Sequence, residues 1–283
     1  MRIANFETRG VAGIAADEGS GWHGLSRSDS GFPGTLPELI AQGADLLRIG
    51  KNLGQSPAVD LKAVRLLPPV PAPPKILCVG LNYDDHLQET GLKKPEYPEI
   101  FARFASSLIA HQEPIRRPRE STALDYEAEL AVVIGKPGRR ISQEQALDHV
   151  AGYSLFNDAT MRDFQVRTPQ WTMGKNFDGT GSFGPWLVTP DAAPPGARGL
   201  RIQGRLNGRV MQDSRTDLLI FSVPVLIATI SVAMTLERGD VIITGTPGGV
   251  GAARKPPVFM KAGDIYEVEI EGLGLLTNPV ENG

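Results

Sequence analysis

The residues from Leu124 to Gly135 place acidic side chains at the start of an apolar run, and this combination constrains the fold strongly. Side chains alternate between the two faces of a strand, so Glu127 and Glu129 share one face. The following Leu-Ala-Val-Val-Ile run indicates a strand that is buried on both faces. The two carboxylates are therefore expected at the edge of the buried core, where the apolar strand begins.

Two interpretations of this acidic pair compete. Carboxylates that converge on one spot raise each other's pKa unless they share a cation, and the hard ions Mg²⁺, Mn²⁺ and Ca²⁺ suit oxygen ligands. The alternative is the solvated face of an edge strand, where such pairs are common. A second strand is expected over Val150–Asp158 and ends in a carboxylate. Asp158 would supply a third ligand if the two strands are neighbours.

The composition is that of an ordinary globular enzyme. Of the 283 residues 41% are hydrophobic and 22% are charged, so disorder is not indicated. The formal net charge of −3 offers no field that attracts a phosphate backbone, so we expect no nucleic-acid partner. The single cysteine, Cys78, rules out an intramolecular disulfide and suits a cytoplasmic location.

One segment requires a decision about membranes. The residues from Leu218 to Leu236 include no charged side chain, and this run is long enough to be a candidate membrane-spanning segment. Serine, threonine and proline residues dilute the run, and apolar residues recur in it at helical spacing. We therefore expect a buried helix over about 224–236 and no membrane partner. The N-terminus shows no signal-peptide pattern.

A proline-rich stretch, Leu67 to Pro74, predicts a boundary between two domains. Residues 1–69 are expected to form a small α+β domain with strands near 1–6 and 11–15 and a helix over about 35–49. Residues 70–283 are expected to form the larger, catalytic domain. A further helix is expected over 142–149, and Asn207-Gly208 predicts a hairpin.

The segment after the strand Lys75–Gly80 carries a histidine and a carboxylate. A short helix over about 86–90 would place His86 and Glu89 on one face, where a carboxylate can orient an imidazole that takes a proton from water. The alternative is an exposed pair on a surface helix. A zinc site is disfavoured because paired histidines or cysteines are lacking.

Three further polar residues follow Asp158. The helical pattern over 160–165 projects Arg162 and Gln165 from the same end as Asp158. Lys175 lies in a loop between Gly174 and Phe177, which restricts it more than a surface lysine, although simple solvation is the alternative.

A glycine-rich loop, Thr246–Gly251, follows the expected strand 240–245. No Gly-Lys-Ser/Thr sequence and no helix follow it, so a nucleotide-binding loop is disfavoured. A backbone nest that binds a carboxylate or an oxyanion, with the hydroxyl of Thr246 added, is still compatible with the sequence.

Taken in order, these motifs resemble the fumarylacetoacetate hydrolase family, in its bacterial branch of acylpyruvase-like and 2,4-dioxo acid hydrolases. The resemblance covers about residues 70–283, and five motifs in order are far more specific than any one of them. The motifs are Gly80–Tyr83 with His86 and Glu89, Asp125–Glu129, Asn157-Asp158 with Arg162, Asp163 and Gln165, Gly174-Lys175, and Thr244–Gly251.

The resemblance implies an α+β fold with a mixed β-roll, usually a homodimer, and a Mg²⁺ or Mn²⁺ ion held by Glu127, Glu129 and Asp158. It implies that His86 with Glu89 activates water and that Lys175 with Gln165 stabilises an oxyanion. The substrate-binding residues that it implies are Arg162, Tyr83, Thr246 and Gly245. Arg103-Phe104 stands where relatives often have Lys-Pro.

The function that we expect from the sequence is a metal-dependent hydrolase that cleaves the C–C bond of a 2,4-dioxo acid, such as an acylpyruvate or a diketo-deoxy sugar acid, to pyruvate and a carboxylic acid. One alternative on the same site is decarboxylation of oxaloacetate-like acids or hydration or isomerisation of 2-oxo-alkenoates. Another is a non-catalytic module that binds a metal or an acid. This last is disfavoured because binding alone needs neither His86 nor Lys175.

Overall fold

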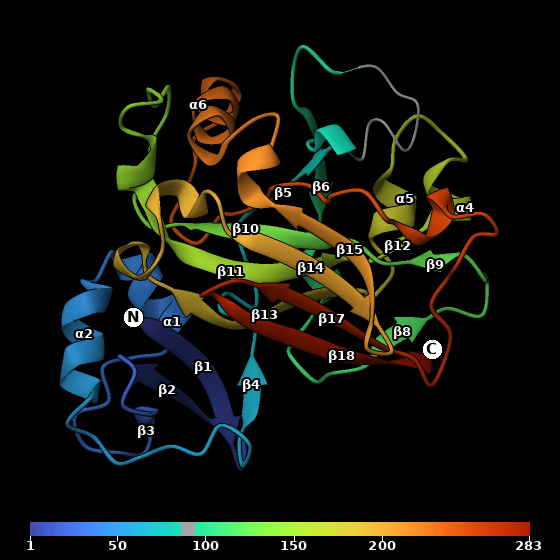
Figure 1. Ribbon diagram of the computed structural model, residues 1–283. Coiled ribbons are helices and arrows are strands. Elements are labelled where there is room, and N and C mark those ends of the chain that lie inside the picture. Colours follow the sequence, from blue (N-terminus) through green and yellow to red (C-terminus); the bar gives the residue numbers. More distant parts are fainter. Residues whose placement is uncertain (86–93) are drawn as a thin grey trace.

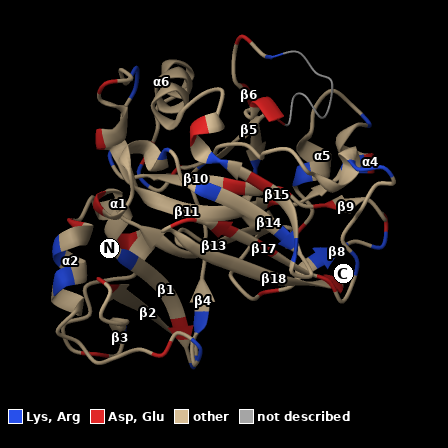
Figure 2. Cartoon of the chain, in the orientation of Figure 1, with Lys and Arg blue, Asp and Glu red and all other residues tan. Residues whose placement is uncertain are grey.

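The structure, a computed structural model, describes residues 1–85 and 94–283. Its strands form two main sheets that pack together, with few helices, which confirms the expected α+β class (Figure 1). Figure 2 shows Lys and Arg interspersed with Asp and Glu over the described elements, as expected for a net charge of −3.

The larger sheet is mixed and has 11 strands. Its main path runs β3-β2-β1-β13-β11-β10-β16-β5-β6, with β4 beside β1 and β7 beside β13. The strands are β1 (Arg2–Thr8), β2 (Val11–Asp17), β3 (His23–Ser26), β4 (Arg65–Leu67), β5 (Ile76–Gly80), β6 (Glu99–Arg103), β7 (Leu108–Ile109), β10 (Ala128–Ile134), β11 (Val150–Asp158), β13 (Gly181–Val188) and β16 (Val241–Ile243).

The second sheet has five strands in the order β15-β14-β17-β18-β8. The hairpin expected at Asn207-Gly208 joins β14 to β15. A separate pair, β9 and β12, extends from the ends of β10 and β11. The strands are β8 (Ile115–Arg117), β9 (Leu124–Asp125), β12 (Thr160–Met161), β14 (Arg201–Leu206), β15 (Arg209–Arg215), β17 (Ile265–Ile270) and β18 (Gly274–Asn282).

Strand β10 lies in the centre of the molecule and contributes to two hydrophobic cores. Leu130, Val132 and Ile134 face the core between the two sheets, which also receives residues of β14, β17 and β18. Ala131 and Val133 face the opposite core, which the N-terminal strands and helices complete. Because both faces are covered, the continuous apolar run in the sequence is explained.

The helices lie outside the sheets. Helix α6 (Val223–Ala233) confirms the apolar helix expected near 224–236 and buries Leu226 and Ile230 in the core between the sheets. It has 11 residues, and no helix within 1–85 or 94–283 is long and apolar enough to cross a bilayer. The remaining α-helices in the described part of the chain are α1 (Leu36–Gln42), α2 (Leu46–Leu53), α4 (Arg162–Gln165) and α5 (Thr172–Lys175).

Two helix predictions need correction. The single helix expected over 35–49 is two helices, because Gly43 adopts a left-handed conformation (φ 68°) that ends α1 and Asp45 accepts a hydrogen bond from the Arg48 amide at the start of α2. The helix expected over 142–149 is a single 3₁₀ turn, Ala146–His149.

The N-terminal segment joins the large sheet. Strand β1 pairs with β13 and with β4, and Met1 and Ile3 share a hydrophobic core with Phe156 and Leu187 of the later chain. Residues 1–69 therefore share a sheet and a core with the rest of the chain. The division into two domains at residue 69 stays a prediction.

Candidate active site

Strands β10 and β11 bring the three predicted metal ligands together. They pair antiparallel with Glu129 opposite Phe156, so Glu127 and Asp158 lie just beyond the same end of the ladder. One carboxylate oxygen from each of Glu127, Glu129 and Asp158 lies within 4.8 Å of the others, and all three residues are buried. We call these three residues the acidic triad.

The strand expected to carry Glu127 and Glu129 is interrupted, although the sequence suggested one continuous strand from Leu124. Tyr126 and Glu127 lie between β9 and β10. At this break Asn157 Oδ1 accepts a hydrogen bond from the Glu127 amide at 3.0 Å, and Glu127 O accepts one from the Asp158 amide at 3.0 Å. These two bonds fix the backbone of Glu127 beside Asp158.

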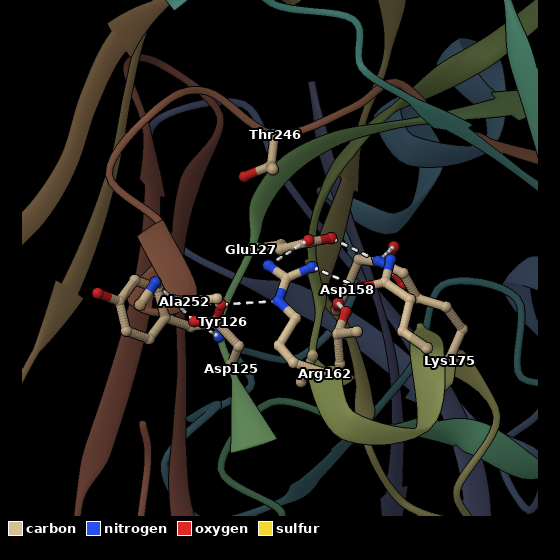
Figure 3. A network of polar contacts seen from close by, with 12 residues as sticks. Asp125, Tyr126, Glu127, Asp158, Arg162, Lys175, Thr246 and Ala252 are labelled. Atoms are coloured by element: carbon tan, nitrogen blue, oxygen red, sulfur yellow. Dashed lines mark hydrogen bonds and ion pairs between the residues drawn. The ribbon is translucent and has the colours of Figure 1, made fainter. Parts of the chain in front are cut away.

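Three cationic side chains of the described residues contact the triad, and Figure 3 shows two of them, Arg162 and Lys175. Arg103 and Lys175 are buried, and Arg162 is 16% exposed. Lys175 Nζ donates to Glu127 Oε2 and to Asp158 Oδ2, both at 2.6 Å. Arg162 Nη2 forms an ion pair with Glu127 Oε1 at 2.7 Å. Arg103 Nη1 donates to Asp158 Oδ1 from the protein interior. The negative charge of the triad is thus largely balanced by side chains from three separate segments.

Arg103 is fixed by several acceptors at once. It donates to Ser107 Oγ at 3.2 Å, to Ala159 O at 3.2 Å and to Thr180 Oγ1 at 2.8 Å, in addition to Asp158. Its side chain has no solvent exposure. In the sequence Arg103 stood out only as a departure from relatives, and its contact with the triad was not predicted.

Burial and charge perturb two groups of the cluster. Burial raises the pKa of Glu129 well above its usual value, and the neighbouring carboxylates of Asp158 and Glu127 raise it further. For Lys175 burial opposes the charged form, but Asp158 and Glu127 outweigh this effect and leave the pKa raised. The two carboxylates therefore favour the ammonium form of Lys175.

Asp125 links Arg162 to the glycine-rich loop. Its Oδ2 accepts hydrogen bonds from Arg162 Nε at 2.8 Å and from the Ala252 amide at 2.9 Å (Figure 3). Its Oδ1 accepts from the Gly251 amide at 2.7 Å. Gln165 Oε1 accepts from Arg162 Nη1 at 3.0 Å. Asp125 was part of a recognised motif, but the sequence assigned no role to it.

Gly245, directly before the glycine-rich loop, contacts the triad. Gly245, in a conformation with φ 104° that favours glycine, donates its amide to Glu129 Oε2 at 2.5 Å. Thr246 Oγ1 donates to Ala128 O at 3.1 Å and accepts from Gln212 at 2.8 Å, so its hydroxyl is already engaged. The amides of this loop therefore bind protein carboxylates.

A cavity of about 610 Å³ opens beside the triad. Its polar side includes the triad, Arg162, Gln165, Lys175 and Thr246, and its apolar side includes Phe101, Trp171, Val250 and Phe259. A small carboxylate substrate would thus meet charge at one end and aromatic or aliphatic groups at the other.

Of the remaining predicted site residues, Tyr83 lies away from the cavity and two lie outside the described residues. Tyr83 is fully buried and is not among the residues that line this cavity, and within the described residues its hydroxyl lacks a hydrogen-bond partner. His86 and Glu89 lie outside the described residues. Asp85, directly before His86, accepts hydrogen bonds from the Gly248 amide at 3.2 Å and from Ser214 Oγ at 3.0 Å.

The acidic triad fits a divalent cation. It offers hard oxygen donors from three converging, buried carboxylates, and such oxygen ligands are those that Mg²⁺ and Mn²⁺ prefer. Its donor set lacks the sulfur and imidazole ligands of a typical zinc site. The residues present therefore fit Mg²⁺ or Mn²⁺ without distinguishing between them.

Comparison with known proteins decides the family. Residues 75–281 match the family model described as fumarylacetoacetate (FAA) hydrolase C-terminal. The chain belongs to the fumarylacetoacetate hydrolase family. This membership confirms the resemblance drawn from the five motifs.

Relatives and solved structures of the family agree over the whole chain. The protein named oxaloacetate tautomerase fahd2, mitochondrial, from Xenopus laevis is 41% identical over 99% of this chain and 90% of its own length. A fumarylacetoacetate hydrolase from Exiguobacterium antarcticum superposes with a TM-score of 0.86 at 38% identity, covering 100% of both chains.

A third similar protein has been solved with a bound metal ion. The structure of maleylpyruvate hydrolase from Sphingobium sp. SYK-6, in complex with manganese(II) and pyruvate, matches with a TM-score of 0.80 at 29% identity and covers 100% of both chains. A member of the same fold thus binds Mn²⁺ together with a 2-oxo acid.

Proposed function

We propose that the protein is a metal-dependent enzyme that interconverts the keto and enol forms of oxaloacetate or a closely similar 2-oxo dicarboxylic acid. The observation that carries this proposal is the buried acidic triad, which opens with Lys175 and Arg162 into one cavity. The 41% identity to a protein named oxaloacetate tautomerase supports it. The C–C hydrolysis expected from the sequence has weaker support than this alternative of isomerase type.

A Mg²⁺ or Mn²⁺ ion held by Glu127, Glu129 and Asp158 would act as a Lewis acid toward the oxygens of a 2-oxo acid. Lys175 lines the cavity as an ammonium and can donate a hydrogen bond to the oxygen at C2. Arg162, held by Asp125 and Gln165, presents a fixed guanidinium to a substrate carboxylate. These two cations stabilise negative charge that develops on the substrate.

Keto–enol exchange also needs a base that removes a proton from C3. We assign this step to His86, with Glu89 orienting its ring, in agreement with the sequence motif. Asp85 supports the assignment because its carboxylate is bound at the glycine-rich loop, and Gly80 and Leu81, a few residues earlier, line the cavity. Exchange of His86 for Gln should abolish tautomerisation and leave Mn²⁺ binding unchanged.

The apolar side of the cavity bears on the choice between reactions. Phe101, Val250 and Phe259 present no polar side-chain atom that could hold a nucleophilic water on this side of the cavity. Hydrolysis needs such a water at the second carbonyl, whereas tautomerisation needs only proton transfer. The Mn²⁺ and pyruvate complex of a maleylpyruvate hydrolase keeps C–C hydrolysis as the second candidate.

A comparison of substrates tests the proposal. Purified protein with Mg²⁺ is mixed with the enol form of oxaloacetate, with oxaloacetate for loss of CO₂ and with an acylpyruvate, and each reaction is followed by NMR. We expect fast loss of the enol signal, abolished by a chelator and by Glu129→Gln, and slow or absent cleavage of the acylpyruvate. Rapid acylpyruvate cleavage without enol conversion would instead identify a hydrolase.

We retain a homodimer and a cytoplasmic location as proposals from the sequence. The relative from Xenopus laevis carries the word mitochondrial in its name, which describes that protein.

A further inference from the structure

Each carboxylate of the acidic triad has one oxygen engaged by a donor other than Lys175. The three donors come from three different segments, so the orientation of each carboxylate is fixed independently. The pairs are Arg162 with Glu127 Oε1, the Gly245 amide with Glu129 Oε2, and Arg103 with Asp158 Oδ1.

The remaining oxygens of the triad are Glu127 Oε2, Glu129 Oε1 and Asp158 Oδ2. Lys175 Nζ binds two of these, at 2.6 Å from Glu127 Oε2 and 2.6 Å from Asp158 Oδ2. A Mg²⁺ ion binds carboxylate oxygens at about 2.0–2.1 Å. Because the other oxygen of each carboxylate already has its own donor, an ion held by the triad would use the oxygens that the ammonium occupies.

We propose that Lys175 is the resident cation of the ion-free site and that a divalent ion displaces its ammonium from Glu127 and Asp158 into the cavity. Two cations on the same two oxygens repel each other strongly in a buried site. Ion binding and release of Lys175 are then one step, which delivers the ammonium to the substrate only when the ion is present. The inference rests on the metal site of the proposed function and not on the reaction.

The packing around Lys175 confines this movement to its side chain. A Cβ on the preceding Gly174 would lie 2.6 Å from backbone atoms of Gln165, so α5 is pressed against α4. The lysine side chain itself has a flexible four-carbon stem. It lines the cavity, and its ammonium lies 5.0 Å from the ring centre of Phe101, another lining residue. The cavity therefore offers both space and an aromatic face to the displaced ammonium.

Calorimetric titration with Mn²⁺, without substrate, tests the exchange. Lys175→Met removes the competing charge and keeps an unbranched side chain, and Lys51→Met, at an exposed position on α2, is the matched control. We expect Lys175→Met to bind Mn²⁺ about tenfold tighter or more than the wild type, and Lys51→Met to bind as the wild type does. Equal or weaker binding by a folded Lys175→Met protein overturns the exchange and leaves the metal site intact. Failure of the wild type to bind Mn²⁺ overturns both.

A second measurement uses the wild type alone, in case Lys175→Met does not fold without metal. Reductive methylation of lysines is followed by mass spectrometry with and without Mn²⁺, with Lys51 as the internal reference. We expect Lys175 to be methylated several-fold faster when Mn²⁺ is bound, because its amine has left the two carboxylates. A rate for Lys175 that is unchanged or slower with Mn²⁺ contradicts the exchange.

Discussion

Arg162 donates its Nε–H to Asp125 Oδ2 at 2.8 Å, and the same carboxylate binds the backbone amides of Gly251 and Ala252. One buried carboxylate thus joins the helix that follows Asp158 to the glycine-rich loop. Arg162 is in turn the ion-pair partner of Glu127. The position of the guanidinium in the cavity therefore depends on a residue that does not itself line it.

Asp125→Asn should show that Asp125 positions Arg162 and takes no direct part in the reaction. The amide offers only one acceptor oxygen and places an NH₂ against existing donors, so we expect a loss of about 2–4 kcal/mol in stability. We also expect KM for a 2-oxo acid to rise more than kcat falls, because Arg162 loses its orientation. Denaturant unfolding and steady-state kinetics measure these effects. Asp213→Asn, in an exposed pair with Arg201, is the control and should change stability by about 0.5 kcal/mol or less.

Arg103→Met should be among the most destabilising single changes in the site. It leaves Asp158 buried without its interior partner, and loss of one partner of a buried ion pair costs about 3–5 kcal/mol. Arg103→Lys keeps the charge but cannot reach all four acceptors, so a smaller loss is expected. Urea unfolding in the presence of a chelator gives both values. A loss for Arg103→Met no larger than that for the exposed Arg201→Met would refute this role.

The sequence predicted the triad because its signals are local. The apolar run after Glu129 and the length of the Val150–Asp158 segment indicate two neighbouring buried strands, and antiparallel pairing then brings Glu127 to Asp158. The cations that surround the triad could not be derived in this way. Arg103 meets Asp158 across 55 residues, and neither residue type nor spacing signals that contact.

The errors in secondary structure have local causes. The sequence offered a helical pattern through Gly43, but a left-handed glycine followed by a capping aspartate starts a new helix. The break at Tyr126-Glu127 was missed because the side chain of Asn157, from the neighbouring strand, satisfies the freed amide.

His111 should make stability depend on pH. Burial lowers its pKa from 6.5 to about 4, and its Nδ1 accepts a hydrogen bond from the Thr277 amide at 3.1 Å. The folded state thus favours the neutral ring. The contribution of His111 to the free energy of unfolding is therefore complete above pH 6.5 and is lost as the pH falls through about 4. We expect the wild type to lose about 2 kcal/mol more than His111→Asn between pH 7 and pH 4. Equal pH profiles of unfolding for the two proteins would contradict this assignment.

The central claim is that the acidic triad holds one divalent ion at the cavity. Glu129→Gln tests it, because glutamine can still accept the Gly245 amide hydrogen bond, whereas its NH₂ replaces the oxygen left for the ion and the negative charge is lost. Free Mn²⁺ is followed by electron paramagnetic resonance during titration of the wild type, of Glu129→Gln and of the exposed control Asp213→Asn. The account predicts one Mn²⁺ per chain for the wild type and the control, and an affinity lower by about 100-fold for Glu129→Gln. Equal affinity of a folded Glu129→Gln protein, or no binding by the wild type, would contradict it.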